Sequence, residues 1–274
     1  MTTSLPFGFE TIWHWLLAYG LALSRPTAML AVNPVFTRAK ISGVIRGAVA
    51  TALAVPMVPV IAATLPDTGV GMVGLLLLAG KEALIGGALG LLLGAPFWAL
   101  DIAGDVLDAQ RGATQGRLND PAGFGDVSIS GTMLVVAGIA LFVATGGLIT
   151  LARLLYDSWA VWRPLGSFPE LDARTPGLLL GLLDSVTRQG LLLAVPPVIA
   201  MLVADAALML VARIAPQLRI DDLALSLRNI VFFLILPPYI LFLVTYIRHD
   251  LAGLPELFDL LRQTAPATAP GVAP

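Results

Sequence analysis

The chain has 274 residues, of which 57% are hydrophobic and only 12% are charged. Soluble domains carry about 25% charged residues, so this composition excludes an ordinary water-soluble protein and favours a chain whose surface faces lipid. The net charge of −2 gives no basic surface for nucleic acid, and the absence of cysteine excludes disulfides, thiolate metal sites and cysteine nucleophiles.

The N-terminal residues 1–10 contain no lysine or arginine, so the basic region of a cleavable signal peptide is missing. We therefore expect the first apolar segment, residues 11–36, to be a retained anchor, although Arg25 and Pro26 lie in its middle. A helix that crosses the hydrocarbon core needs about 20 mostly apolar residues. Four runs without acidic or basic residues approach this length and predict membrane-spanning helices: residues 47–66, 83–100, 127–152 and 229–247.

Residues 176–214 form an apolar segment that is too long for one simple span. The segment predicts either one long bent helix or a helical hairpin. Pro196 and Pro197 lie in its middle and are expected to kink or break it, because proline lacks the helix N–H and clashes with the preceding turn.

Charged residues also lie inside the apolar segments. Residues 70–100 contain Lys81 and Glu82, and residues 176–214 contain Asp184, Arg188 and Asp205; with Arg25, we take Lys81, Glu82 and Asp205 as intramembrane charges. A charge at the bilayer centre costs about 2.5–3.5 kcal/mol on insertion scales, so such residues usually face protein or water. Lys81 and Glu82 project about 100° apart on a helix and need not pair with each other. We expect them either to make contacts inside an assembly, beside a conduit, or to lie near an interface and snorkel toward water.

Asp101, Asp105 and Asp108 follow the apolar run with the spacing of one helix face. Their like charges repel, so an opposite charge or water must offset them. Arg111, three residues after Asp108, is one candidate, and a water-filled lumen or a partner subunit is another. A proton relay is a further alternative, although carboxylates beyond the end of a span more often form a solvated helix face.

Glycine spacing predicts close helix packing in the membrane. Gly86, Gly90 and Gly94 form a double small-xxx-small stripe, which lets two helix backbones approach each other closely. Two further pairs repeat this spacing: Gly43 with Gly47, and Gly177 with Gly181.

Residues 103–131 are polar and rich in glycine, and they lie between two hydrophobic runs. Asp120 and Pro121 mark a turn within them. Long structured loops of this kind are often functional; the alternative is a plain connector between helices. We expect a single helical membrane domain over residues 1–262. Residues 263–274, rich in alanine and proline, predict a disordered tail.

Over residues 10–250 the chain resembles the T subunit of the type III secretion export apparatus (SctT) and its flagellar relative FliR. The matching elements keep one order along the chain: Arg25 with residues 33–36, Lys81 and Glu82 with residues 85–90, residues 103–105, residues 108–112, Asp120 and Pro121, Gly146 and Gly147, Ser158, residues 164–166, and Arg213 with residues 215–218. Each element is weakly specific alone, and their order is strongly specific. Leu148 stands where flagellar members commonly have histidine, and residues 110–113 look like the injectisome version, which favours an injectisome over a flagellum.

The resemblance implies an all-α polytopic membrane protein built of long, partly broken helices and helical hairpins. It implies a core subunit of the inner-membrane export gate, which assembles with R and S subunits into a conduit for unfolded substrates. Further implied partners are the S-associated switch subunit, the large export-gate subunit, secreted polypeptides in transit and membrane lipid. No nucleic acid, cofactor or metal is implied.

Within this resemblance, we expect residues 103–130 to lie at the gate or at subunit contacts. The candidate residues are Asp105, Asp108, Gln110, Arg111, Gly112, Asp120 and Pro121.

Two rival functions are weighed against this one. A secondary transporter or channel for a small solute or ion fits the intramembrane charges, but no repeat of two related halves is evident. An intramembrane enzyme needs a nucleophile with a base, or converging metal ligands. With no cysteine, and with His14 and His249 near opposite chain ends, we expect no enzymatic site.

Overall fold

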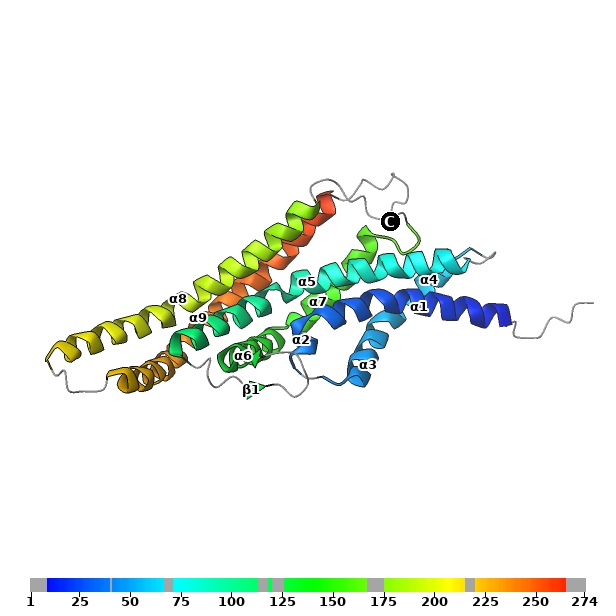
Figure 1. Cartoon of the computed structure of the whole chain (residues 1–274). Coiled ribbons are helices and arrows are strands. Elements are labelled where there is room, and N and C mark those ends of the chain that lie inside the picture. Colours follow the sequence, from blue (N-terminus) through cyan, green and yellow to red (C-terminus); the bar gives the residue numbers. More distant parts are fainter. Residues whose placement is uncertain are drawn as a thin grey trace, which may run out of the picture. The chain divides into compact units, whose positions relative to one another are not determined.

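The computed structural model describes residues 9–39, 41–66, 71–112, 118–119, 126–166, 175–214 and 220–264. These residues are almost entirely helical (Figure 1). The prediction of an all-α, polytopic helical membrane protein is therefore confirmed. The predicted turn at Asp120 and Pro121, and residues 265–274 of the predicted tail, lie outside the described residues.

The elements follow one another along the chain in this order: α1 (Phe9–Val32), α2 (Pro34–Thr37), α3 (Gly43–Ala54), the 3₁₀ turn η1 (Val55–Met57), α4 (Val58–Thr64), α5 (Met72–Arg111), β1 (Leu118–Asn119), β2 (Asp126–Val127), α6 (Ile129–Ala144), α7 (Gly147–Val161), α8 (Thr175–Ile214) and α9 (Ile220–Thr264). The two short strands pair in antiparallel fashion. Five helical stretches of the described chain are long and apolar enough to cross a membrane: Thr11–Val32, Gly43–Thr64, Met72–Arg111, Leu180–Ile214 and Leu223–Tyr246.

The predicted span at residues 127–152 is not one continuous helix. It is divided at Thr145 and Gly146 into α6 and α7, which count as a sixth span only as a bent pair. Gly146 has a φ of +82°, a left-handed conformation that glycine adopts without a Cβ penalty and that commonly ends helices. Counting charges alone missed this break, because the signal is a Gly-Gly pair inside an apolar run.

The helical hairpin expected as one alternative for residues 176–214 is wrong, since α8 runs unbroken from Thr175 to Ile214 through Pro196 and Pro197. Pro197 has no N–H to offer to the carbonyl of Leu193, four residues earlier. The hydroxyl of Tyr239 in α9 donates to that carbonyl instead, at 2.9 Å. The neighbouring helix thus replaces a hydrogen bond that the proline removes, which is how membrane helices tolerate proline.

Replacing Tyr239 with phenylalanine is expected to destabilise the folded chain by about 1 kcal/mol, the upper range for interhelical hydrogen bonds in membranes. The measurement is the thermal unfolding midpoint of the purified chain in mild detergent. In a Pro197→Ala background, Leu193 regains a backbone donor, so the same Tyr239→Phe change is expected to cost less. An equal loss in both backgrounds would show that the hydroxyl does not serve the proline gap.

The chain packs as two compact units. Unit 1 is Met1–Gly94, Gly147–Thr175 and Gly253–Pro274, and unit 2 is Ala95–Gly146 and Pro176–Ala252. The core of unit 1 includes these buried residues: Ala18, Leu21, Ala22, Ala54, Ile61, Ala62 and Leu65. The core of unit 2 includes Leu100, Leu107, Leu134, Leu193, Met201, Phe232 and Tyr239. Each unit also contains a buried charged cluster.

Candidate functional site

Three helices of unit 1 contribute to a buried ion pair. Arg25 of α1 and Glu82 of α5 are both fully buried, with 2.8 Å between Nε and Oε2. Trp159 of α7 donates its indole N–H to the same carboxylate oxygen at 3.3 Å. The Trp159 ring also faces the guanidinium, whose Cζ lies 5.3 Å from the ring centroid. A desolvated carboxylate is therefore held by an arginine and an indole together.

The other two guanidinium nitrogens of Arg25 donate hydrogen bonds to α7 and to the residue that follows it. Nη1 donates to Ser158 Oγ at 2.8 Å, and Nη2 donates to the carbonyl of Trp162 at 2.9 Å. Ser158 in turn donates to the carbonyl of Leu155 at 2.6 Å. The guanidinium thereby connects α1, α5 and α7 through one rigid, planar group.

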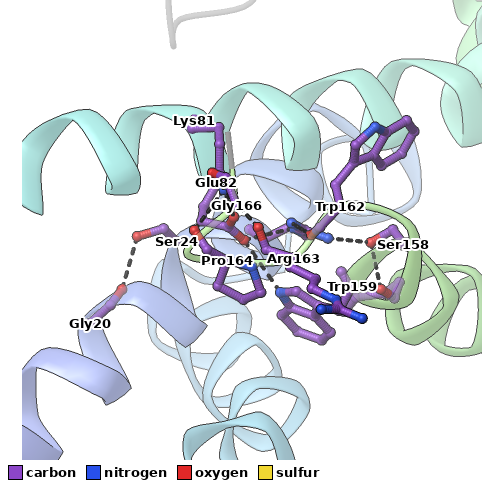
Figure 2. A network of polar contacts seen from close by, with 12 residues as sticks. Gly20, Ser24, Lys81, Glu82, Ser158, Trp159, Trp162, Arg163, Pro164 and Gly166 are labelled. Atoms are coloured by element: carbon purple, nitrogen blue, oxygen red, sulfur yellow. Dashed lines mark hydrogen bonds and ion pairs between the residues drawn. The ribbon is translucent and has the colours of Figure 1, made fainter. Parts of the chain in front are cut away.

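The ammonium of Lys81, the residue before Glu82, binds backbone carbonyls and not mainly a carboxylate (Figure 2). Nζ donates to the carbonyls of Arg163, Pro164 and Gly166, at 2.8, 2.6 and 3.1 Å. It also lies 3.4 Å from Glu82 Oε1, but this is an ion-pair contact without hydrogen-bond geometry. Lys81 and Glu82 are thus in contact, although the hydrogen bonds of Lys81 are made to backbone carbonyls.

The glycine stripe on α5 allows α1 to lie close to α5 beside this cluster. An ideal Cβ built on Gly86 would collide with the carbonyl of Arg25, and one on Gly90 would lie 2.5 Å from the carbonyl oxygen of Met29. Two positions four residues apart on α5 thus meet two positions four residues apart on α1. The missing side chains let α1 approach α5 closely enough for Arg25 to reach Glu82.

The other glycines of this spacing behave differently. Gly94 is buried in α5. Four further glycines have no described atom within 4 Å of an ideal Cβ: Gly43, Gly47, Gly177 and Gly181. The spacing alone therefore does not identify which stripe makes a contact within the chain.

Unit 2 contains a second buried cluster at the end of α5. Asp108 Oδ1 accepts from Arg111 Nη2 at 3.0 Å. Its Oδ2 accepts from Ser128 Oγ at 2.7 Å and from the backbone N–H of Ser130 at 3.1 Å. The carboxylate therefore lies at the N-terminus of α6, where a negative charge is favoured by the helix dipole. The guanidinium of Arg111 lies over the Phe232 ring, 4.3 Å from its centroid.

The other residues predicted at the gate or at subunit contacts are placed differently. Asp105 is exposed on α5, and Gln110 is half-buried near its end. Gly112 follows α5 with a φ of +74°, a conformation that favours glycine. Asp120 and Pro121 lie outside the described residues. The structure thus brings the aspartate and arginine of this region together and leaves Asp105 outside their cluster.

Asp205, the last intramembrane charge noted in the sequence, pairs with a residue of the next helix. Arg228 Nε in α9 lies 2.8 and 3.0 Å from the two carboxylate oxygens of Asp205 in α8. Both side chains are partly exposed, at 29% for Arg228 and 13% for Asp205. This pair is therefore less desolvated than the pair in unit 1.

Sequence reasoning missed several members of these clusters. Arg228 borders an apolar run, and Ser128 precedes a helix as an N-cap, so both carried a weak signal. Trp159 and the backbone N–H of Ser130 carried none, since only tertiary packing brings them to a carboxylate.

The chain is similar to known proteins along most of its length. The family described as "Bacterial export proteins, family 1" matches residues 16–254. "Yop proteins translocation protein T" of Yersinia pestis is 31% identical over 225 residues, covering 82% of this chain and 86% of that protein. "Surface presentation of antigens protein SpaR" of Salmonella typhimurium is 29% identical over 231 residues, covering 83% and 84%. "Flagellar biosynthetic protein FliR" of Pectobacterium carotovorum is 27% identical over 266 residues, covering 94% and 96%. The chain therefore belongs to family 1 of the bacterial export proteins.

Proposed function

We propose that the chain is a core subunit of the inner-membrane export gate of a type III secretion system, in an injectisome rather than a flagellum. It assembles with R and S subunits into the conduit for unfolded substrates. The S-associated switch subunit and the large export-gate subunit are its further partners. Membership of an export family supports this role, and an export-apparatus component needs no enzymatic site.

One observation carries the proposal that the chain works in an assembly. Helices α5 and α8 have 40 residues each and α9 has 45. At 1.5 Å per residue they are about 60 Å long or more, while the hydrocarbon core is about 30 Å thick. Even when tilted by about 40° from the membrane normal, each helix extends well beyond the hydrocarbon core.

Large apolar side chains are exposed along most of α8, from Leu180 to Ile214, which is about 50 Å of helix at 1.5 Å per residue. On α9 they extend from Leu223 to Phe242, about the thickness of the hydrocarbon core, so the surface of α8 is the part that exceeds the bilayer. Lipid covers only the part of this surface that lies within the bilayer. Apolar surface beyond it favours association with other proteins, which agrees with a multi-subunit export apparatus.

The transporter alternative loses its main support. The intramembrane charges that suggested a solute site bind protein groups of the same chain: Arg25 pairs with Glu82, Lys81 with backbone carbonyls, and Asp205 with Arg228. Over the described residues, no group of three or more His, Asp or Glu side chains is placed to hold a metal ion.

The experiment that tests the proposal is co-purification. The tagged chain is expressed with the R and S subunits of the same organism's secretion system and extracted in mild detergent. A discrete complex that retains both partners is expected. A well-folded chain that purifies without either partner would overturn the proposal, and solute uptake in proteoliposomes would then be measured.

Asp105 provides the sharpest variant for that experiment, because it is exposed, whereas Arg111 is buried against Asp108 and its loss would disturb folding. Asp105→Lys is expected to reduce the recovered R and S subunits about tenfold, as expected for loss of one charged contact worth about 1.4 kcal/mol. Secretion should fall while insertion stays normal. Asp105→Glu keeps the charge and is the control. Normal assembly and secretion of Asp105→Lys would remove Asp105 from the interface.

A further inference from the structure

The five residues after α7, Trp162 to Gly166, form a non-helical segment that we name the carbonyl strap. Four of its five carbonyls accept hydrogen bonds from two cations, Arg25 and Lys81. Figure 2 shows Lys81 with the four residues that carry these carbonyls: Trp162, Arg163, Pro164 and Gly166. The last carbonyls of a helix and the turn after it have no intrahelical donors. In an apolar environment each unsatisfied carbonyl is costly. The two cations therefore satisfy carbonyls of which, among the described residues, only that of Arg163 also has a backbone donor, the N–H of Gly166.

Lys81 and Arg25 contribute to this arrangement in separable ways. Arg25 gives one hydrogen bond to the strap, at Trp162, and directs Nε to Glu82. Lys81 gives all its hydrogen bonds to the strap, at Arg163, Pro164 and Gly166. An ammonium has three donors, so these three carbonyls use them all.

The carbonyl strap also carries two apolar side chains that are at least partly buried. Pro164 is buried, and Leu165 is half-buried and packs against the core of unit 1, to which α1, α3 and α4 contribute. Arg163 and Gly166, on either side, are exposed. The side chains therefore bury the strap only in part. Its carbonyls bind Lys81 and Arg25, and the carbonyl of Arg163 also accepts from the backbone N–H of Gly166 at 3.0 Å.

We propose that Lys81 is a latch, a positioning residue whose ammonium holds the carbonyl strap closed and keeps the half-buried Leu165 packed against the core of unit 1. The latch acts locally: without it the strap opens while the helices of unit 1 stay packed around the Arg25–Glu82 pair. This role does not depend on the export function.

A cysteine-reactivity experiment tests the latch, since the chain has no native cysteine. Leu165→Cys introduces one thiol in the strap of the full-length chain, purified in mild detergent. The rate of its reaction with N-ethylmaleimide is measured. Adding Lys81→Met, which keeps the length of the side chain and removes its donors, is expected to raise this rate at least about tenfold, because three charge-assisted hydrogen bonds are lost.

Two matched chains separate a latch from general destabilisation. Ala22→Cys places the thiol at a fully buried position of the same core, and it should stay protected when Lys81→Met is added. Arg153→Met removes an exposed cation of α7 and should leave the Leu165→Cys rate unchanged. The proposal is overturned if Lys81→Met leaves the Leu165→Cys rate unchanged. It is also overturned if Ala22→Cys accelerates equally, or if Arg153→Met has the same effect.

Discussion

Replacing Glu82 with alanine is expected to destabilise the folded chain by about 3–5 kcal/mol, the usual effect of removing one partner from a buried ion pair. Arg25 and Lys81 would then lie buried without a carboxylate, and the indole of Trp159 would lose its acceptor. The measurement is the thermal unfolding midpoint of the purified chain, together with the amount of chain that accumulates in the membrane.

Asp205→Ala is the matched control for this prediction. It also removes the acid of an interhelical acid–arginine pair, but the groups of that pair are partly exposed, so lipid headgroups or water can solvate the remaining arginine. Its expected cost is about 1 kcal/mol. If Glu82→Ala costs no more than Asp205→Ala, burial does not set the strength of the cluster in unit 1.

The sequence allowed the fold class to be predicted, because runs without charge mark membrane helices irrespective of their packing. It also allowed the charged members Arg25, Lys81 and Glu82 to be identified as unusual. Their pairing was not predictable, since Arg25 and Glu82 are 57 residues apart along the chain and come into contact only when α1 packs against α5. Arg111 was predicted as one candidate partner of Asp108, because residues three apart on a helix are neighbours, and their contact in the structure confirms this alternative.

Two helical segments could not be fully predicted from hydropathy. For residues 176–214 the prolines left a long bent helix and a hairpin as alternatives, and the structure shows one continuous helix, in which Tyr239 of another helix donates to the carbonyl of Leu193. The apolar run at 127–152 suggested one helix, yet it breaks at Gly146. Local hydropathy reports neither the hydroxyl of a neighbouring helix nor the left-handed conformation of a glycine.

The glycine stripe gives the second prediction with a large expected effect. Gly86→Ala is expected to destabilise the chain by about 3 kcal/mol, at the upper end for overpacking of a tight contact. Its Cβ would collide with the backbone carbonyl of Arg25, which cannot rotate away as a side chain would. The two helices must separate, and Arg25 then loses its short contact with Glu82. The unfolding midpoint should fall by about 6–12 °C for a chain of this size.

Gly87→Ala is the control, because no described atom lies within 4 Å of an ideal Cβ at that neighbouring position. It should be neutral or stabilising by up to about 1 kcal/mol, since alanine has the higher helix propensity. Gly86→Ala combined with Glu82→Ala should cost less than the sum of the two changes, because both act through the same Arg25–Glu82 contact. Additive losses would mean that the glycine stripe and the ion pair stabilise the α1–α5 contact independently.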